Sequence, residues 1–179
     1  MSASSRKPYG RWGAGVALVQ LALLPVPWSV RRRLLQRLFG YEIHPTATIG
    51  FSIVAPKRLR MGPGAVSRHL NLIRGMDLLS MDAGAGISRG NWIYATPAGA
   101  PVYAHQPERR PEFILEEGSG ITRRHLIDCS ASVRLGRYSM LVGAGTQLLT
   151  HGITVRENRT SRGRRRSRSG TSAWWPPAP

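Results

Sequence analysis

The chain has 179 residues, of which 41% are hydrophobic, so we expect one domain with a modest core rather than two catalytic units. Its 26 basic and 9 acidic residues give a formal net charge of +17, a balance that suggests nucleic acid or an anionic membrane face as a partner. Cys129 is the only cysteine, which excludes an internal disulfide framework, and no metal site is expected.

The positive charge has a second explanation in the composition. Lys7 and Lys57 are the only lysines, and arginine supplies the rest in a chain that is also rich in Gly, Ala and Pro. A GC-rich coding sequence produces this bias as readily as selection for a partner does. No helix-turn-helix, zinc finger or aromatic-studded basic sheet is present, so nucleic acid is not the expected partner. The single cysteine favours a reducing, cytoplasmic setting.

Residues 1–40 are predicted to be helical and amphipathic. The apolar run over residues 13–24 is too short to span a bilayer, because Pro25 and Pro27 interrupt it before the roughly 20 residues that a membrane needs. No small-residue cleavage site follows, which argues against a signal peptide. We therefore expect a helix that caps the core or lies at a membrane interface.

A second helix is predicted to begin at Ser29 as its N-cap and to end at Gly40. Apolar residues recur at helical spacing between them, at Val30, Leu34, Leu35, Leu38 and Phe39. Two interpretations remain open for this helix. It packs against the end of the domain that follows, or residues 13–39 contact anionic lipid at the inner face of the cell membrane.

From residue 41 onward the sequence is periodic. Aliphatic residues return every six positions, at Ile43 and Ile49, at Met81, Ile87 and Ile93, at Leu115, Ile121, Ile127 and Val133, and at Leu135 and Leu141. A period of six fits neither a helix nor a half-buried strand. Small or polar residues fill the positions between these anchors, which suits short flat strands joined by sharp corners, with one aliphatic side chain pointing inward from each.

This pattern predicts an all-β fold, a left-handed parallel β-helix of the hexapeptide-repeat kind, over residues 41–159. Three six-residue units would close one coil. Residues 96–111 carry four prolines and no apolar period, so we interpret them as a loop inserted at a corner, where such loops often shape a binding cleft. The competing folds are an antiparallel sandwich or barrel, which would show alternation and hairpin turns.

The most specific stretch is residues 127–151, with the sequence IDCSASVRLGRYSMLVGAGTQLLTH. It resembles the hexapeptide-repeat acyltransferases, particularly bacterial O-acetyltransferases that act on sugars of surface polysaccharides, nodulation factors and small galactosides. The resemblance covers roughly residues 41–159. It implies acetyl-coenzyme A as the donor, a sugar or glycan hydroxyl as the acceptor, and a homotrimer with active sites between neighbouring subunits.

The same resemblance implies that His151 is the catalytic base and that Glu157 and Arg159 lie in a loop over the acceptor. The residue type suits the chemistry, because a sugar hydroxyl needs a base to remove its proton as it attacks a thioester, and a histidine has an ordinary pKa of about 6.5. Without the family, His151 reads as a polar residue at an exposed corner.

Three further residues are candidates for acceptor binding. His69 and His125 occur in similar strings, SRHL and RRHL, which predicts corresponding positions on different coils. His125 would then line the acceptor cleft or stack on a coil face. Asn91 and Trp92 would contact a sugar, since amides and aromatic faces suit polyols, although Trp92 would equally cap the coil interior.

The repeat stops near residue 160, whereas full-length relatives of this kind continue with one or two further coils. Residues 160–179 are rich in Arg, Trp and Pro, and we expect them to be disordered. GC-rich DNA that is translated out of frame gives this amino-acid composition. One expectation is therefore a frameshift that leaves an inactive, truncated acyltransferase. An authentic basic tail that binds RNA or lipid is the other.

Overall fold

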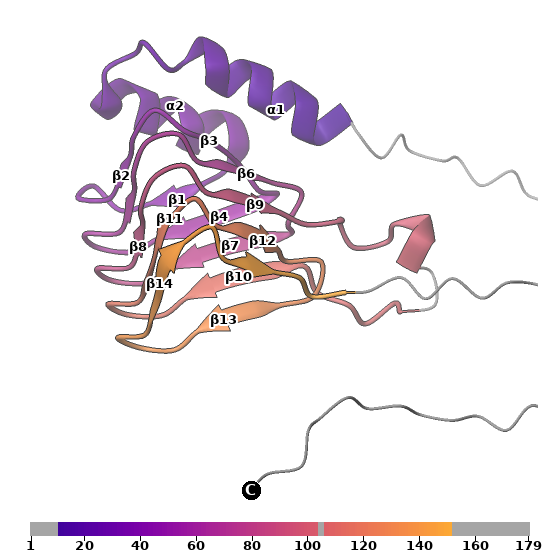
Figure 1. Cartoon of the computed structure of the whole chain (residues 1–179). Helices are drawn as coiled ribbons and strands as arrows, with labels where there is room; N and C mark the ends of the chain where they lie inside the picture. The colour runs from indigo at the N-terminus through magenta and orange to yellow at the C-terminus, as the bar shows by residue number, and fades with distance from the viewer. Residues whose placement is uncertain (1–10, 104–105, 152–179) are drawn as a thin grey trace, which may run out of the picture.

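A computed structural model of the chain describes residues 11–103 and 106–151 (Figure 1). Three predictions fall on residues outside this part of the chain. They concern the roles of Glu157 and Arg159 and the disorder of residues 160–179.

Two helices come first, α1 (Arg11–Ala22) and α2 (Trp28–Phe39). Within the described residues, fifteen short strands follow and form three sheets of five strands each. Sheet A contains β1 (Glu42–Ile43), β4 (Arg58–Met61), β7 (Leu78–Met81), β10 (Glu112–Leu115) and β13 (Val133–Leu135). Sheet B contains β2 (Thr48–Ile49), β5 (Val66–Ser67), β8 (Gly86–Ile87), β11 (Gly120–Arg123) and β14 (Met140–Ala144). Sheet C contains β3 (Ile53–Ala55), β6 (Leu72–Arg74), β9 (Trp92–Tyr94), β12 (Leu126–Asp128) and β15 (Gln147–Leu148).

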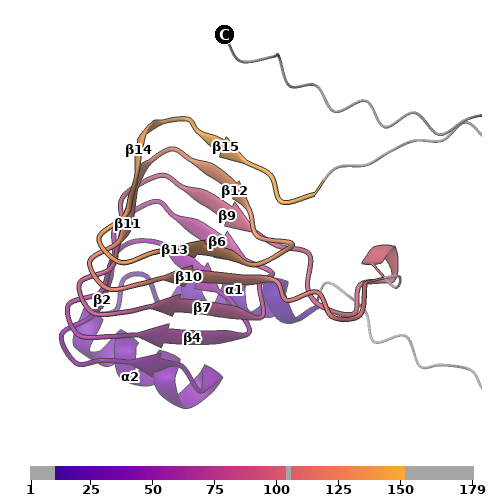
Figure 2. The ribbon, with the colours of Figure 1, turned by 90° about the horizontal axis from the view of Figure 1, so that it is seen from below.

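The three sheets are the sides of a triangular coil, seen end-on in Figure 2. Each strand pairs in parallel with the strand at the same position in the next coil, for example β4 with β7 and β7 with β10. The predicted class is confirmed: the chain is a parallel β-solenoid of about five turns, preceded by two helices. An antiparallel sandwich or barrel is excluded, because every strand pair of the described residues is parallel.

The length of a coil differs from the prediction. Three six-residue units would give 18 residues, and Thr46 and Gly64 of the first two coils are indeed 18 positions apart. Later coils are longer, as Asn71 and Asn91 show with a separation of 20. The separation of paired residues rises from 18 between β2 and β5 to 19 between β3 and β6 and to 20 between β4 and β7, so one residue is added at each corner beside sheet C. Strands of sheet A turn two side chains inward, as Leu79 and Met81 do in β7. This also explains the two-residue step from Val133 to Leu135, since both lie on β13.

The core runs along the axis of the solenoid. Ile87, Ile93, Ile121 and Ile127 are buried, as the six-residue period predicts. Leu135 and Leu141, predicted to be equally buried, are only half-buried. They belong to the last described coil, over which no further coil stacks within the described residues.

The connection between β9 and β10 is long and contains the short helix η1 (Pro101–Tyr103). It runs out from the corner between sheets C and A, to one side of the stack in Figures 1 and 2. The insertion increases the separation of equivalent residues in these two coils to 34, as between Asn91 and His125.

Helices α1 and α2 cover the open end of the first coil (Figure 1). The buried side chain of Gln20 pairs with both backbone groups of Val54, since Nε2 donates to the carbonyl at 2.5 Å and Oε1 accepts from the N–H at 2.8 Å. The guanidinium of Arg31 donates to the carbonyls of Gly50 and Ser52, each at 2.9 Å. Side chains therefore satisfy backbone groups that a further coil would otherwise pair.

The helix boundaries differ slightly from the predicted ones. The N-cap of α2 is Pro27, and no side-chain cap is present, so Ser29 is wrong as the N-cap. The carbonyl of Pro27 already accepts from the N–H groups of Val30 and Arg31, which places Ser29 inside the first turn. The predicted end is confirmed, because Gly40 adopts the left-handed conformation at φ 67° that a helix C-terminus favours. None of the described helices has the length and apolar character needed to cross a bilayer.

Candidate active site

His151 follows β15, the last described strand of sheet C. Its Nδ1 atom pairs with Oδ2 of Asp128, the final residue of β12 in the coil below. The Asp128 side chain is completely buried, whereas 34% of the His151 side chain is exposed. A buried carboxylate therefore holds one edge of an imidazole whose remainder faces outward.

The contacts of Asp128 determine how the imidazole of His151 is oriented. Oδ1 accepts from the backbone N–H of Ser130 at 2.8 Å, and the only partner of Oδ2 among the described residues is His151. An imidazole that donates from Nδ1 to a carboxylate carries its lone pair on Nε2 when it is neutral. Asp128 thus orients His151 as an aspartate does in a catalytic triad, with Nε2 available as a base.

The insertion supplies the neighbours of this pair. The ring of Tyr103 meets the ring of His151 edge-on, with centroids 5.7 Å apart and an interplanar angle of 87°. The guanidinium carbon of Arg109 lies 3.9 Å from the centroid of Tyr103. The contacts with Arg109 and with the imidazole hold the tyrosine ring beside the candidate base.

Arg109 also ties the insertion to the solenoid. It donates to the carbonyls of Thr96 and Pro97, both at 2.8 Å, and to the carbonyl of Ser130. The N–H of Thr96 in turn donates to Oγ of Ser130 at 3.0 Å. Ser130, whose N–H donates to Asp128, therefore links the base of the insertion to that carboxylate.

Two of the predicted acceptor-binding residues lie elsewhere. Asn91 and His125 are buried at the corner between sheets B and C, where polar side chains form a ladder from coil to coil. Oδ1 of Asn71 accepts from the N–H of Asn91, and Oδ1 of Asn91 accepts from the N–H of His125, each at 2.9 Å. Both side chains are enclosed and hold the corner together, and their contact with an acceptor stays a prediction.

The predicted correspondence of His69 and His125 is wrong. Strand register aligns Leu72 with Trp92 and Trp92 with Leu126, so His125 is the equivalent of Asn91 and not of His69. Nε2 of His125 lies 2.9 Å from Oγ1 of Thr122, and Nδ1 has no partner among the described residues. Burial lowers the pKa of His125, which keeps the ring neutral.

Trp92 is 51% exposed on the outer face of sheet C, between Leu72 and Leu126 on the neighbouring strands. It does not cap the coil interior. Its position leaves the predicted contact with an acceptor open, whereas Glu157 and Arg159 lie outside the described residues.

Sequence reasoning missed Asp128, Tyr103 and Arg109. A signal for Asp128 existed in the sequence, because Asp128 directly follows the inward-facing Ile127. Parallel pairing of β12 with β15 then brings Asp128 close to the residues that follow β15, among them His151. Tyr103 and Arg109 gave no periodic signal, since they belong to the insertion.

The pair of His151 and Asp128 can support acid–base chemistry. Within residues 11–103 and 106–151, no three His, Cys, Asp or Glu side chains lie close enough together to hold a metal ion. Cys129 is buried next to Asp128, and burial, reinforced by the negative charge of Asp128, raises the pKa of the thiol. The thiol is therefore a poor nucleophile.

Fold and site together define a parallel β-solenoid with a histidine–aspartate pair beneath an inserted loop. Comparison with protein-family models, curated protein sequences and solved structures found no match to this chain.

Proposed function

We propose that this protein is an acyltransferase that moves an acetyl group from acetyl-coenzyme A to a sugar hydroxyl, with His151 as the general base. The observation that carries the proposal is the pair of His151 and the buried Asp128. The donor and the class of acceptor come from the resemblance of residues 41–159 to hexapeptide-repeat acyltransferases. That resemblance also supports a homotrimer and a place in surface polysaccharide biosynthesis in the cytoplasm.

The chemistry follows from the orientation of the imidazole. Nε2 of His151 takes the proton of the acceptor hydroxyl as the hydroxyl oxygen bonds to the thioester carbonyl carbon. The carbon–sulfur bond then breaks, and the leaving sulfur recovers the proton from Nε2. Asp128 stabilises the imidazolium that exists between these transfers. No acyl-enzyme is needed, in keeping with the buried thiol of Cys129.

The surroundings of His151 suit a sugar. Tyr103 lies against the imidazole, and Trp92 is exposed on the same sheet that carries Asp128 and leads to His151. Aromatic rings with one polar end bind the apolar faces of sugars while leaving their hydroxyls solvated. The insertion thus provides one wall of the proposed acceptor site.

A peripheral contact with an anionic membrane is a second proposal, for the helical end of the molecule. Leu18 and Leu21 of α1 are 68% and 53% exposed, and Arg33 and Arg37 of α2 are exposed as well. Exposed apolar residues close to arginines favour insertion at the boundary between headgroups and acyl chains. Binding to vesicles with and without anionic lipid tests this, and Leu18→Ser with Leu21→Ser should weaken it.

The enzymatic proposal is tested by measuring thiol release from acetyl-coenzyme A in the presence of a panel of sugars and oligosaccharides, using the full chain. An acyltransferase releases thiol only when a suitable acceptor is present, and the acceptor gains one acetyl ester detectable by mass spectrometry. A basic binding protein would show no turnover and would bind nucleic acid with an affinity that falls steeply with salt. Acceptor-independent thiol release, or none with any acceptor, would contradict the proposal.

A further inference from the structure

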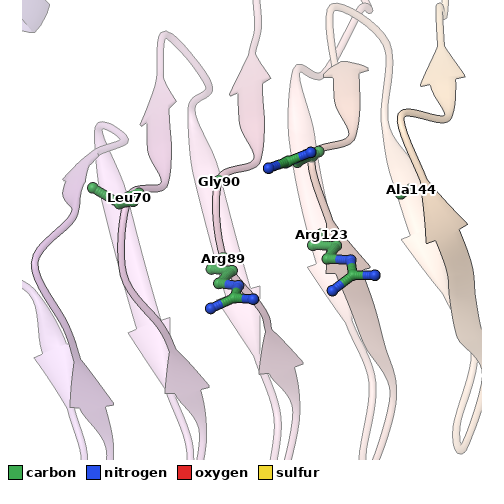
Figure 3. A pocket seen from close by; sticks show the side chains of 6 residues that line it. Leu70, Arg89, Gly90, Arg123 and Ala144 are labelled. Atoms are coloured by element: carbon green, nitrogen blue, oxygen red, sulfur yellow. The ribbon is translucent and has the colours of Figure 1, made fainter.

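A pocket lies at the outer side of the corner between sheets B and C, separated from His151 by the length of sheet C. Figure 3 shows it from close by. Its volume is about 540 Å³, and it is lined by Leu70, Arg89, Gly90, Arg123, Arg124 and Ala144. These residues come from four successive coils, so the pocket runs parallel to the axis of the solenoid.

The pocket is strongly positive and lacks acidic neighbours. The described ion pairs of arginine with glutamate involve Arg58, Arg60 and Arg134, all on sheet A. Apart from Asp128, every carboxylate in the described part of the chain belongs to sheet A, to the turns beside it or to the insertion. The charges of Arg89, Arg123 and Arg124 therefore have no protein counterion among the described residues.

The arginines also repel one another. Ile87 pairs with Ile121, which aligns Arg89 with Arg123 on adjacent coils. Neighbouring strands lie roughly 4.8 Å apart, and like charges directly opposite one another are destabilising. An arrangement that lowers the stability of the fold points to a role in binding, where an anion would relieve the repulsion.

The backbone at this corner carries a second unfavourable feature. Leu70, Gly90 and Arg124 are equivalent residues of successive coils, and all three adopt the left-handed region, at φ 61°, 73° and 60°. Glycine suits this conformation, whereas a side chain makes it strained. A Cβ atom at Gly90 would lie 3.7 Å from Cγ of Arg124, so the arginine stem runs over the glycine. The chain keeps a leucine and an arginine at positions whose backbone conformation favours glycine, and strain of this kind gathers at functional sites.

We propose that this pocket binds a phosphate-bearing ligand, with Arg89, Arg123 and Arg124 taking a diphosphate. Guanidinium groups bind phosphate oxygens in pairs, and three of them match a group with more than one negative charge. Leu70, which is 75% exposed at one wall, offers an apolar surface to the organic part of the ligand. The proposal stands on a corner remote from His151 and does not depend on the acyltransferase function.

Calorimetric titration of the full chain with inorganic pyrophosphate, and with orthophosphate for comparison, tests the pocket. We expect saturable binding that is tighter for pyrophosphate. Arg89→Gln combined with Arg123→Gln should weaken it by at least about tenfold for each arginine lost, because each loss removes a charge-assisted hydrogen bond. Arg60→Gln, which removes the same charge from exposed sheet A, is the matched control and should leave the affinity unchanged.

Arg124→Gly is a control for variants that lose binding only because they unfold. Glycine relieves the strain at φ 60°, so this variant should unfold no more easily than the wild type and yet bind pyrophosphate more weakly. Equal affinity in wild type and pocket variants, or an equal loss in Arg60→Gln, would overturn the proposal. So would arginine-dependent binding of a short RNA without any binding of pyrophosphate, because a nucleic-acid surface would then explain the charge.

Vesicles distinguish the two sources of a phosphate ligand. If the ligand is a free organic diphosphate, binding to vesicles with phosphatidylglycerol should be the same in wild type and in the Arg89 and Arg123 double variant. If the ligand is a lipid headgroup, the double variant should lose vesicle binding, and pyrophosphate should compete with the vesicles for the wild type. Either result supports the binding of a phosphate group in the pocket, and the two results differ only in the source of that group.

Discussion

Oδ2 of Asp128 and Nδ1 of His151 meet across two adjacent coils of the solenoid, at the side where the insertion leaves the stack. One partner is wholly buried and the other is about one-third exposed. The contact brings together residues that follow neighbouring strands of sheet C. It gives the outward-facing histidine a fixed orientation, and the catalytic proposal depends on it.

Replacing Asp128 tests that orientation. Asp128→Asn keeps the size of the side chain, but its amide donates to Nδ1 of His151 and moves the proton to Nε2, where no base then remains. We expect turnover with the best acceptor to fall roughly 10- to 1,000-fold, with a smaller change in KM for the acceptor. Steady-state kinetics measure this, with circular dichroism as the check on folding. Unchanged turnover in a folded variant would show that Asp128 does not position the base.

The helical cap should contribute to stability through Gln20. Gln20→Ala removes two hydrogen bonds and leaves the N–H and carbonyl of Val54 unpaired in a buried place. The free energy of unfolding should fall by about 2–4 kcal/mol. Urea denaturation measures the loss, and Gln147→Ala, at an exposed position of β15, should change it by less than about 0.5 kcal/mol. Equal stability of the two variants would mean that the helices do not seal the first coil.

The buried histidine of the ladder should make the fold sensitive to acid. Because burial lowers the pKa of His125, the unfolded chain binds a proton more readily than the folded one does. The contribution of neutral His125 to the free energy of unfolding is therefore fully present above the ordinary histidine pKa of about 6.5, and it declines as the pH falls below that value. His125→Asn installs the residue found at this ladder position in the two preceding coils. Urea denaturation at about pH 7.5 and about pH 5.5 should show a smaller loss of stability for the variant than for the wild type. An identical loss would assign the acid sensitivity to other groups.

Cys129 should resist modification in the folded protein. Its thiol is buried and its pKa is raised, so the reactive thiolate is scarce. A chromogenic disulfide reagent should react slowly with the native chain and quickly in urea. The single cysteine makes this readout unambiguous, and the slow reaction also permits the thiol-release assay of acyl transfer. Rapid stoichiometric labelling of the native chain would contradict the burial of the thiol.

The six-residue period was sufficient to predict the solenoid, because inward side chains such as Ile87 and Ile121 repeat wherever a strand faces the axis. The alignment of one coil over another was harder to predict. The strings around His69 and His125 look alike, but the strand register places the two residues two positions apart at the same corner. His151 was found through the resemblance. Its contacts with Asp128 and Tyr103 depend on stacking and on the insertion, which a period does not encode.

The central claim, that His151 removes the proton of the acceptor, is tested most directly by the turnover of His151→Ala in the acetyl-transfer assay. His44→Ala is the matched control, since His44 is a half-buried histidine of the first coil whose ring forms hydrogen bonds only with Thr46 among the described residues. We expect His151→Ala to lower kcat by roughly two to four orders of magnitude while the fold stays intact, and His44→Ala to keep the wild-type rate. Near-wild-type turnover in His151→Ala, or an equal collapse in both variants, would contradict the assignment of His151 as the base.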